Sequence, residues 1–201
     1  MIGIIDYGVG NLFSVQNSLD YLGVETALVD TPAGLEAADG LLLPGVGAFP
    51  DAMAMLQKSG LVGSLKAQAE KKPLLGICLG MQLLFDTGYE FAETPGLGLI
   101  PGTVRLLEAP GLKIPHMGWN SLELTNPCPL TQGLKEGDYV YFVHSYAACT
   151  HPRYICAQTT YGQTVPALVR RDNVYGAQFH PEKSSAVGLT ILENFAKLVN
   201  G

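Results

Sequence analysis

The sequence predicts an α/β fold with a mixed, mostly parallel sheet flanked by helices and a β-rich second half. The first observation is that short apolar runs in the first half alternate with helical patterns, which is typical of a parallel sheet covered on both faces. The second is that strand-like runs follow one another after residue 96, with turn residues and no helix between them. The 201 residues contain no linker-like stretch, so we expect residues 1–201 to form a single domain.

The first half should contribute four buried strands, because its apolar runs are short and continuous. They are expected at residues 2–5, 24–29, 40–43 and 73–77. Helices are expected at residues 12–22, at 51–69 with a break at Gly60, and at 79–85. The first of these helices is predicted from four apolar residues that would share one helical face, namely Leu12, Val15, Leu19 and Leu22.

The second half should contribute six more strands before the chain closes with a helix. The strands are expected at residues 103–107, 121–124, 139–143, 154–160, 165–170 and 174–179. The closing helix carries apolar residues at helical spacing, namely Leu189, Leu192, Phe195 and Val199. We expect these strands to form a meander that is appended to the sheet of the first half or continues it.

Composition and charge exclude several classes of protein. The net charge of −6 disfavours nucleic-acid binding, which needs clustered Lys and Arg to neutralise phosphates. No stretch of 18 apolar residues is present, so no membrane span or membrane partner is expected, and the start lacks the basic region of a signal peptide. The four cysteines form no C-x-x-C pair, which predicts reduced thiols and a cytoplasmic location. Charged residues are only 15%, which suggests that another protein covers part of the surface.

The segment Gly76-Ile77-Cys78-Leu79-Gly80 has the pattern of a nucleophile elbow, with cysteine in the place of serine. It follows an apolar strand and opens a helix, so Cys78 would project from a sharp turn at the edge of the sheet. Glycines two residues to either side remove Cβ atoms that would clash in such a turn, and a helix N-terminus favours a thiolate. The alternative is a buried core cysteine flanked by two glycines by chance.

A thiolate nucleophile needs a base, and His180 is the best candidate among the four histidines. It follows the last predicted strand, and Pro181 biases it toward an extended conformation. In an extended segment His180 and Glu182 would point to the same side, so the carboxylate could hold the tautomer of the imidazole. The alternative is a solvated loop histidine beside a surface glutamate.

Stabilising an oxyanion requires hydrogen-bond donors near the nucleophile. One would be the backbone N–H of Leu79, the residue that follows Cys78. The other should come from a loop after a neighbouring strand, and Pro44-Gly45-Val46-Gly47 ends such a strand. The alternative reading of this Pro-Gly segment is a plain turn.

Taken together, the motifs resemble those of the triad, or class I, glutamine amidotransferase family, and the resemblance covers essentially the whole chain. In order, they are Asp6-Tyr7-Gly8-Val9-Gly10-Asn11, Pro44-Gly45-Val46-Gly47, Gly76-Ile77-Cys78-Leu79-Gly80-Met81-Gln82, His116-Met117-Gly118-Trp119-Asn120, His144-Ser145-Tyr146 and His180-Pro181-Glu182-Lys183-Ser184. The elbow identifies only the family. The first and fourth motifs are similar to those of glutaminase subunits that serve a cyclase in histidine biosynthesis.

The resemblance implies hydrolysis of L-glutamine to glutamate and ammonia, without a metal or other cofactor. Cys78 would form a γ-glutamyl thioester, His180 would transfer protons, and Glu182 would orient His180. Oxyanion donors would come from Val46, Gly47 and Leu79. Residues implied in substrate binding are Gly45, Gln82, His144, Ser145 and Tyr146.

The resemblance also implies a heterodimer with a (β/α)₈-barrel cyclase subunit that uses the ammonia. Asn11, Trp119, Tyr141 and Lys183 would lie near this partner. The chain ends soon after its closing helix, so we expect the ammonia acceptor in a separate chain. We also expect the isolated chain to be a poor glutaminase, because uncoupled turnover would waste glutamine.

Other readings remain open on the residues alone. The segment from Gly8 to Phe13, with Asp30 about 20 residues on, is a dinucleotide-binding pattern that lacks its third glycine; a tight turn with Asn11 as helix N-cap is the alternative. A non-catalytic flavodoxin-like binding module would need neither Cys78 nor His180. A γ-glutamyl peptidase, or the glutaminase of another synthase such as anthranilate synthase, would share the triad.

Overall fold

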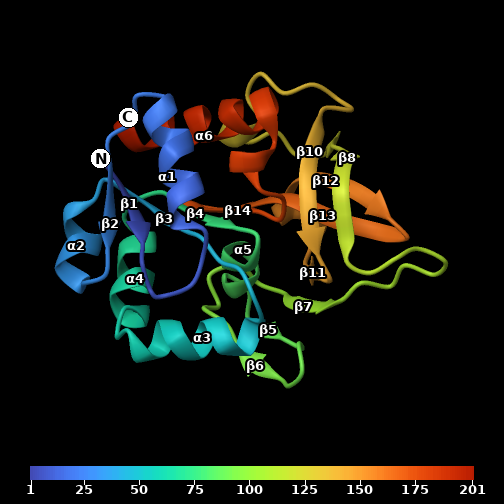
Figure 1. The fold of residues 1–201 in the computed structure, drawn as a ribbon, viewed down its shortest axis with the longest axis horizontal. Coiled ribbons are helices and arrows are strands. Elements are labelled where there is room, and N and C mark those ends of the chain that lie inside the picture. The colour runs from blue at the N-terminus through green and yellow to red at the C-terminus, as the bar shows by residue number, and fades with distance from the viewer.

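The computed structural model describes residues 1–201, and an eight-stranded mixed sheet forms its centre (Figure 1). Strands β2, β1, β3, β4 and β14 run parallel in that order, and β13, β12 and β9 continue the sheet in antiparallel pairs. The bounds are β1 Ile2–Ile5, β2 Thr26–Val29, β3 Gly40–Leu43, β4 Leu74–Ile77, β9 Glu123–Leu124, β12 Ile155–Tyr161, β13 Gln163–Arg171 and β14 Val174–Ala177. The predicted fold class is confirmed.

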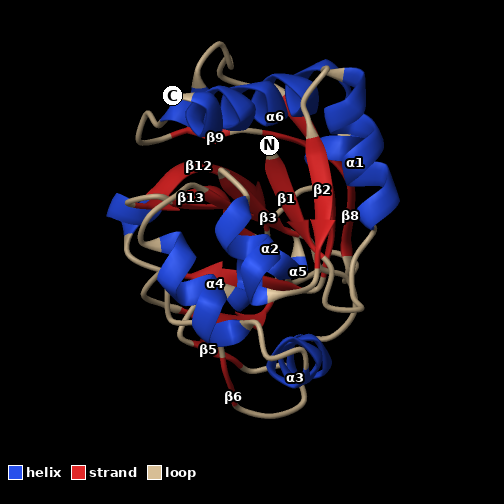
Figure 2. Ribbon diagram, turned by 90° about the vertical axis from the view of Figure 1, so that its left-hand side faces the viewer, coloured by secondary structure: helices blue, strands red, loops and turns tan.

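Helices cover both faces of the sheet (Figures 1 and 2). Helices α1 (Leu12–Tyr21) and α6 (Ser185–Asn200) pack on one face. The opposite face is covered by α2 (Pro32–Ala37), α3 (Phe49–Lys58), α4 (Val62–Ala69) and α5 (Leu79–Leu83). None of these helices is long and apolar enough to cross a membrane.

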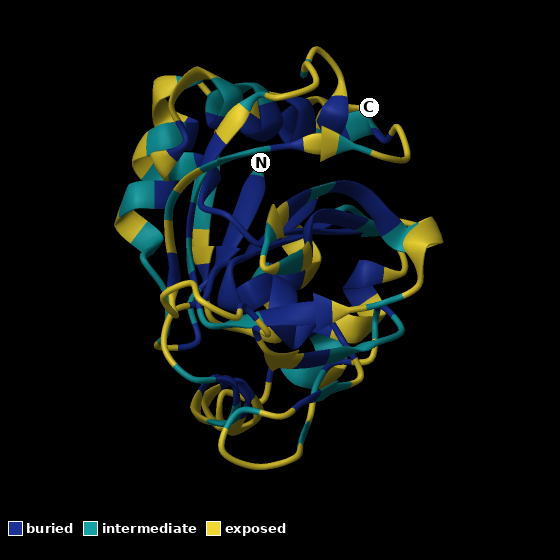
Figure 3. Cartoon of the chain, turned by 90° about the vertical axis from the view of Figure 1, so that its right-hand side faces the viewer, coloured by how far each residue is buried: buried dark blue, intermediate teal, exposed yellow.

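The two faces explain why the strands of the first half are continuous apolar runs. Side chains alternate along a strand, so neighbours enter different cores. Ile4 packs in the core beneath α1 and α6, whereas Ile5 packs in the core on the other side. Figure 3 shows the result: the central strands of the main sheet are buried, whereas exposed residues lie on the outer surfaces of helices, in loops and on strands outside the centre of that sheet.

The second half also forms two small sheets beside the main one. One pairs β8 (His116–Ser121) with β10 (Tyr139–His144), and the other has the order β11 (Tyr146–Cys149), β7 (Thr103–Leu106), β5 (Thr87–Gly88) and β6 (Thr94–Pro95). The expectation of one continuous meander is therefore wrong, because only β12 to β14 and the short β9 join the main sheet. A single residue, Ser145, separates β10 from β11, so the chain passes from one small sheet to the other at that point.

Other differences from the expected elements have local causes. Helix α2 was not expected, yet Thr31 and Pro32 carry its start signal: the Thr31 hydroxyl accepts a hydrogen bond from the Gly34 N–H at 3.2 Å. In place of the strand expected at residues 121–124, the chain forms β8, which begins at His116 and pairs along its full length with β10, and the short β9. The expected break at Gly60 is confirmed, since α3 ends and α4 begins around this residue, which has a φ of +75°.

Candidate active site

Cys78 occupies a strained turn between β4 and α5. Its φ of +53° and ψ of −112° are unusual for a residue with a side chain. A Cβ at Gly80 would lie 1.9 Å from the Leu43 carbonyl oxygen, and one at Gly76 would lie 2.6 Å from the Gly80 carbonyl oxygen. Both flanking glycines are therefore required by close backbone contacts, as the elbow pattern predicts.

His180 and Glu182 form a buried pair at the end of the strand next to β4. His180 Nδ1 lies 2.8 Å from Glu182 Oε1, and the side chains are 5% and 1% exposed. His180 itself is extended, as predicted, but Pro181–Lys183 forms a single 3₁₀ turn. That turn, and not a continuous extended segment, brings the carboxylate back to the ring.

Hydrogen bonds from other elements hold this turn in place. The His180 N–H donates to the Tyr141 carbonyl at 3.0 Å, and the Ser184 hydroxyl donates to the His180 carbonyl at 2.6 Å. The same hydroxyl accepts from the Tyr141 N–H at 3.0 Å. Strand β10 and the turn are thereby tied together on both sides of the imidazole.

The electrostatics of the site favour a charged imidazole beside the thiol. Burial works against the charged form of His180, but hydrogen bonds to Cys78 and Glu182 outweigh it and raise the pKa of His180 to about 9. Because Nδ1–H donates to Glu182, Nε2 is the nitrogen left for Cys78. At neutral pH the imidazole is therefore protonated and can donate a proton from Nε2.

Cys78 and His180 line a cavity of about 400 Å³, which is large enough for a small substrate. Its walls include most of the residues that the sequence singled out, namely Val46, Gly47, Cys78, Leu79, Gln82, His144, Ser145, Tyr146, His180 and Lys183. Gly45 does not line it; a Cβ there would lie 2.6 Å from the Gly80 N, so this glycine packs against the start of α5. Residues from the three sheets therefore meet at one cavity.

Gln82 and Gln178 form the polar floor beside Cys78. The Gln82 side-chain amide donates to the Tyr146 carbonyl at 2.9 Å and to Gln178 Oε1 at 3.1 Å. Gln178 is fully buried, and its Nε2 lies 4.0 Å from Cys78 Sγ. Sequence reasoning missed Gln178, although it stands directly after β14 and two residues before His180.

Glu90 is a second cavity residue that sequence reasoning missed. It lies in the loop between β5 and β6, and its Oε2 accepts a hydrogen bond from the Phe49 N–H at 2.7 Å. This contact places a carboxylate at the N-terminus of α3, where the helix dipole stabilises negative charge. A carboxylate on the cavity wall is suited to binding an ammonium group of a substrate.

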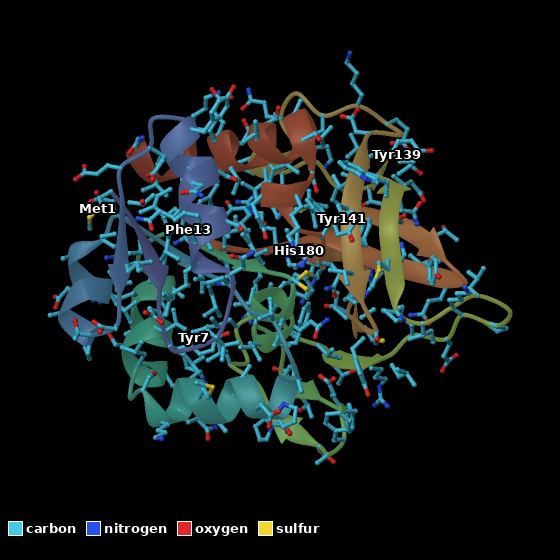
Figure 4. The ribbon with its side chains drawn as sticks, viewed as in Figure 1. Met1, Tyr7, Phe13, Tyr139, Tyr141 and His180 are labelled. Carbon is cyan, nitrogen blue, oxygen red and sulfur yellow. The ribbon has the colours of Figure 1, made fainter.

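Two of the residues expected near a partner, Trp119 on β8 and Tyr141 on β10, lie opposite each other in the paired strands. The Trp119 and Tyr141 rings lie edge to face, with centroids 6.1 Å apart, and Trp119 is 51% exposed. Lys183 is exposed and lines the cavity. Figure 4 shows Tyr141 on β10 between Tyr139 and His180. Aromatic rings exposed next to a catalytic cavity are typical of a protein interface.

The segment after β1 is a tight turn that caps α1. The Asn11 Oδ1 accepts from the Ser14 N–H at 3.3 Å, and the Asp6 carboxylate accepts from the Gly8 N–H at 3.1 Å. Phe13 is 72% exposed, so its ring does not enter the core. The structure favours the helix-cap reading over the dinucleotide reading. No group of three or more His, Cys, Asp or Glu residues has the arrangement of a metal site.

Comparisons with known proteins agree with this geometry. A family model described as "Glutamine amidotransferase class-I" matches residues 3–199. The chain is 55% identical to "Imidazole glycerol phosphate synthase subunit HisH" of Desulfitobacterium hafniense (strain DSM 10664 / DCB-2), over 100% of this chain and 95% of the relative. It is 51% identical to the protein of the same name from Shouchella clausii (strain KSM-K16), over 100% of both.

Two solved structures share the fold at lower identity. One is titled "Crystal structure of glutamine amidotransferase" and superposes with a TM-score of 0.78 at 22% identity, covering 100% of this chain and 99% of the other. The other is PurLQS from Thermotoga maritima, with a TM-score of 0.70 at 18% identity, covering 98% and 97%. At these identities the likeness concerns the fold alone.

Proposed function

The chain belongs to the class-I glutamine amidotransferase family, and from this premise we propose that it is the glutaminase subunit of an imidazole glycerol phosphate synthase. In this role it hydrolyses L-glutamine to glutamate and ammonia and passes the ammonia to a cyclase subunit in histidine biosynthesis. The observation that carries the proposal is that Cys78 and His180 line one cavity while Glu182 holds His180 from outside that cavity, in a chain about half identical to relatives of that name.

In the first half of the reaction, the Cys78 thiolate attacks the side-chain carbonyl carbon of glutamine. The carbonyl oxygen becomes an oxyanion, and the backbone N–H groups of Leu79 and of the loop Val46–Gly47 are its proposed donors. The His180 imidazolium gives its Nε2 proton to the leaving nitrogen, so the C–N bond breaks and ammonia departs. A γ-glutamyl thioester on Cys78 remains.

In the second half, the now neutral His180 takes a proton from water, which attacks the thioester carbonyl. The C–S bond breaks, glutamate leaves, and the thiolate–imidazolium pair is restored. Glu182 accepts a hydrogen bond from Nδ1 throughout, so it holds the ring in one orientation and stabilises its charge.

Binding of glutamine by its α-groups would orient the amide toward Cys78. The Glu90 carboxylate is the proposed partner of the α-ammonium group, and the backbone at Ser145 and Tyr146 is the proposed site for the α-carboxylate. Both lie on walls of the cavity that carries the thiol, so one substrate molecule can contact them together with Cys78.

The proposed partner is a (β/α)₈-barrel cyclase that docks over Trp119, Tyr141, Lys183 and Asn11 to form a heterodimer. With ammonia it converts N′-(phosphoribulosyl)formimino-AICAR-ribonucleotide to imidazole glycerol phosphate and AICAR-ribonucleotide. Direct transfer matters because ammonia in neutral water is protonated and loses its nucleophilicity. Val46 and Gly47 are exposed, and Gly47 has a φ of +94°, so this loop offers a gate that the partner could set.

The test is glutamate release from L-glutamine by the chain alone, and by the chain with a cyclase barrel and its nucleotide ligand. Cys78→Ala is the blank in both. Strong activation by the liganded barrel, lost in the variant, is the expected result. Turnover that ignores the barrel would contradict the assigned partner, and preference for γ-glutamyl peptides over free glutamine would make the chain a peptidase.

A further inference from the structure

A buried chain of hydrogen bonds runs behind the cavity from Asn120 to the backbone of Tyr146. Asn120 Nδ2 lies 3.3 Å from His116 Nε2, and His116 Nδ1 lies 2.9 Å from His144 Nε2. His144 Nδ1 lies 2.8 Å from the Tyr146 carbonyl oxygen. The triad chemistry uses none of these groups, and His116 does not line the cavity.

The groups at the two ends of this series of hydrogen bonds determine which ring nitrogen of each histidine carries the proton. A carbonyl can only accept, so His144 must carry its proton on Nδ1 and present a lone pair at Nε2. His116 must then donate from Nδ1, which leaves its Nε2 as an acceptor for the Asn120 amide. The amide orientation is independently fixed, because Asn120 Oδ1 accepts from the Ser121 N–H at 2.9 Å and Nδ2 also donates to the Thr160 carbonyl at 3.0 Å.

The surroundings keep both rings neutral and in place. The His116 ring is stacked between Phe142 and Tyr161, with centroids 4.7 Å and 4.1 Å away. Burial lowers the pKa of His116 to about 4 and is also the main cause that lowers the pKa of His144 to about 4. A neutral ring has one donor and one acceptor, which is what this chain of hydrogen bonds requires.

The series of hydrogen bonds ends at the backbone of Tyr146, which forms part of the cavity wall. The Tyr146 carbonyl accepts from both His144 Nδ1 and Gln82 Nε2, and the Ser145 carbonyl accepts from the Leu107 N–H at 2.9 Å. With both carbonyls held, the backbone of Ser145 and Tyr146 has one orientation toward the cavity. If the His144 proton moved to Nε2, the ring could no longer donate to Tyr146.

We infer that His116 and Asn120 are positioning residues for glutamine binding, because they lock the His144 proton on Nδ1 and thereby orient the Ser145–Tyr146 backbone. This inference rests on the proposed function, since the ligand it concerns is glutamine. Neither residue touches the reacting atoms, so their loss should weaken substrate binding and leave the thiol chemistry intact.

Two substitutions at His116 separate the hydrogen bond from the packing. His116→Phe keeps an aromatic ring between Phe142 and Tyr161 but removes the donor to His144. His116→Asn loses the stacking but places an amide N–H near the position of Nδ1. In the complex with the cyclase, His116→Phe should raise KM for glutamine about five- to tenfold with kcat within about twofold, the size expected for one hydrogen bond. His116→Asn should keep KM near the wild-type value while its thermal midpoint falls.

Two readouts do not depend on glutamine turnover. Nitrogen-15 NMR of the wild-type chain should show His116 and His144 protonated at Nδ1, and His144 should lose this preference in His116→Phe. Alkylation of Cys78 by iodoacetamide should proceed at the wild-type rate in both variants.

Several results would overturn the inference. They are a wild-type His144 protonated at Nε2, an unchanged KM in His116→Phe, or a rise of KM in His116→Asn with none in His116→Phe, which would make the role one of packing. If the wild-type complex does not hydrolyse glutamine, the proposed function fails. The proton positions would still support or overturn the lock on His144.

Discussion

The two sides of the triad are held by different means. Cys78 is held by a positive φ and by close backbone contacts at its two glycines: Gly76 lies against Gly80, and Gly80 lies against Leu43 at the end of β3. His180 and Glu182 are held by hydrogen bonds from β10 and from Ser184. The elbow is thus held by steric contacts of the backbone, whereas the His–Pro–Glu turn is held by hydrogen bonds.

This difference predicts that substitutions at the elbow and at the His–Pro–Glu turn have different effects. Additions to the elbow should disturb packing, because there is no space beside its glycines. Changes at the turn should disturb charge and proton placement while the fold persists. The predictions below test this contrast in order of decreasing effect.

Removing the nucleophile should abolish turnover without harming the fold. Cys78→Ala keeps the Cβ and the strained backbone, so the elbow should form as before. Glutamate release by the complex should fall by about 10⁴-fold or more, as for loss of a nucleophile that acts with its base. The thermal midpoint should stay close to the wild-type value, and residual turnover above a tenth of wild type would refute the assignment.

Gly80→Ala should strongly destabilise the folded chain. The new Cβ would meet the Leu43 carbonyl oxygen at 1.9 Å, and strand β3 cannot move aside without breaking its pairing with β4. We expect a loss of about 3 kcal/mol in the free energy of unfolding, measured by urea denaturation.

Gly63→Ala is the matched control, because it lies in α4 with nothing within 4 Å of the added Cβ. There the free energy of unfolding should rise by about 0.5 kcal/mol, since alanine favours a helix over glycine. Equal effects at positions 80 and 63 would contradict the role of close packing at the elbow.

Glu182→Gln should reduce activity while the fold persists. The amide keeps the size of the side chain but removes the charge that stabilises the imidazolium at 2.8 Å. We expect kcat to fall by about 100-fold or more, the range attributed to general acid–base catalysis and to carboxylates that orient a catalytic histidine. Unchanged kcat would show that Glu182 does not act through His180.

The pH dependence of kcat/KM tests the charge of His180. Hydrogen bonds raise the pKa of His180 to about 9, so wild-type kcat/KM should fall tenfold per pH unit above about 9, as the acid is lost. In Glu182→Gln this alkaline limb should move to lower pH. A raised pKa also stabilises the folded state at low pH, so this contribution is full below about 6.5 and is lost as pH rises through about 9.

Ser184→Ala should have the smallest effect of this series. It leaves the Tyr141 N–H and the His180 carbonyl without their partner in a buried place. We expect a loss of about 1 to 2 kcal/mol in the free energy of unfolding, and a smaller fall in kcat than in Glu182→Gln. Ser64→Ala in α4 serves as the control. A Ser184→Ala variant as stable as wild type would contradict the hydrogen-bonded origin of the turn.

The elbow shows how far local reasoning reaches. Cys78, its two glycines and the preceding apolar strand lie within eight residues, and the pattern is recognisable there, although the need for glycine at position 80 comes from the contact with Leu43 of β3. The His180–Glu182 pair was predicted from its spacing, but the expected extended segment is a 3₁₀ turn. The two residues still meet, because His180 is the extended residue at the start of this turn and the turn brings the Glu182 carboxylate to 2.8 Å from the ring.

Glu90, Gln178 and the buried pair His116 and His144 show where local reasoning ends. Glu90 is held at the cavity by the Phe49 N–H at the start of α3, a residue 41 positions away in sequence. His116 reaches His144 only because β8 and β10 pair in a register that sets these two residues opposite each other. No periodicity or spacing along the chain encodes such contacts.

Residue types and neighbours along the chain were enough to predict the buried parallel strands, the elbow, the members of the proposed triad and the family. The division of the second half among three sheets, and the place of Ser145 where two of them meet beside Cys78, became visible only in the folded chain. The same holds for the contact between His116 and His144 on which the inferred proton positions depend. Register, burial and hydrogen-bond partners involve groups that are distant in sequence and become neighbours only when the chain folds.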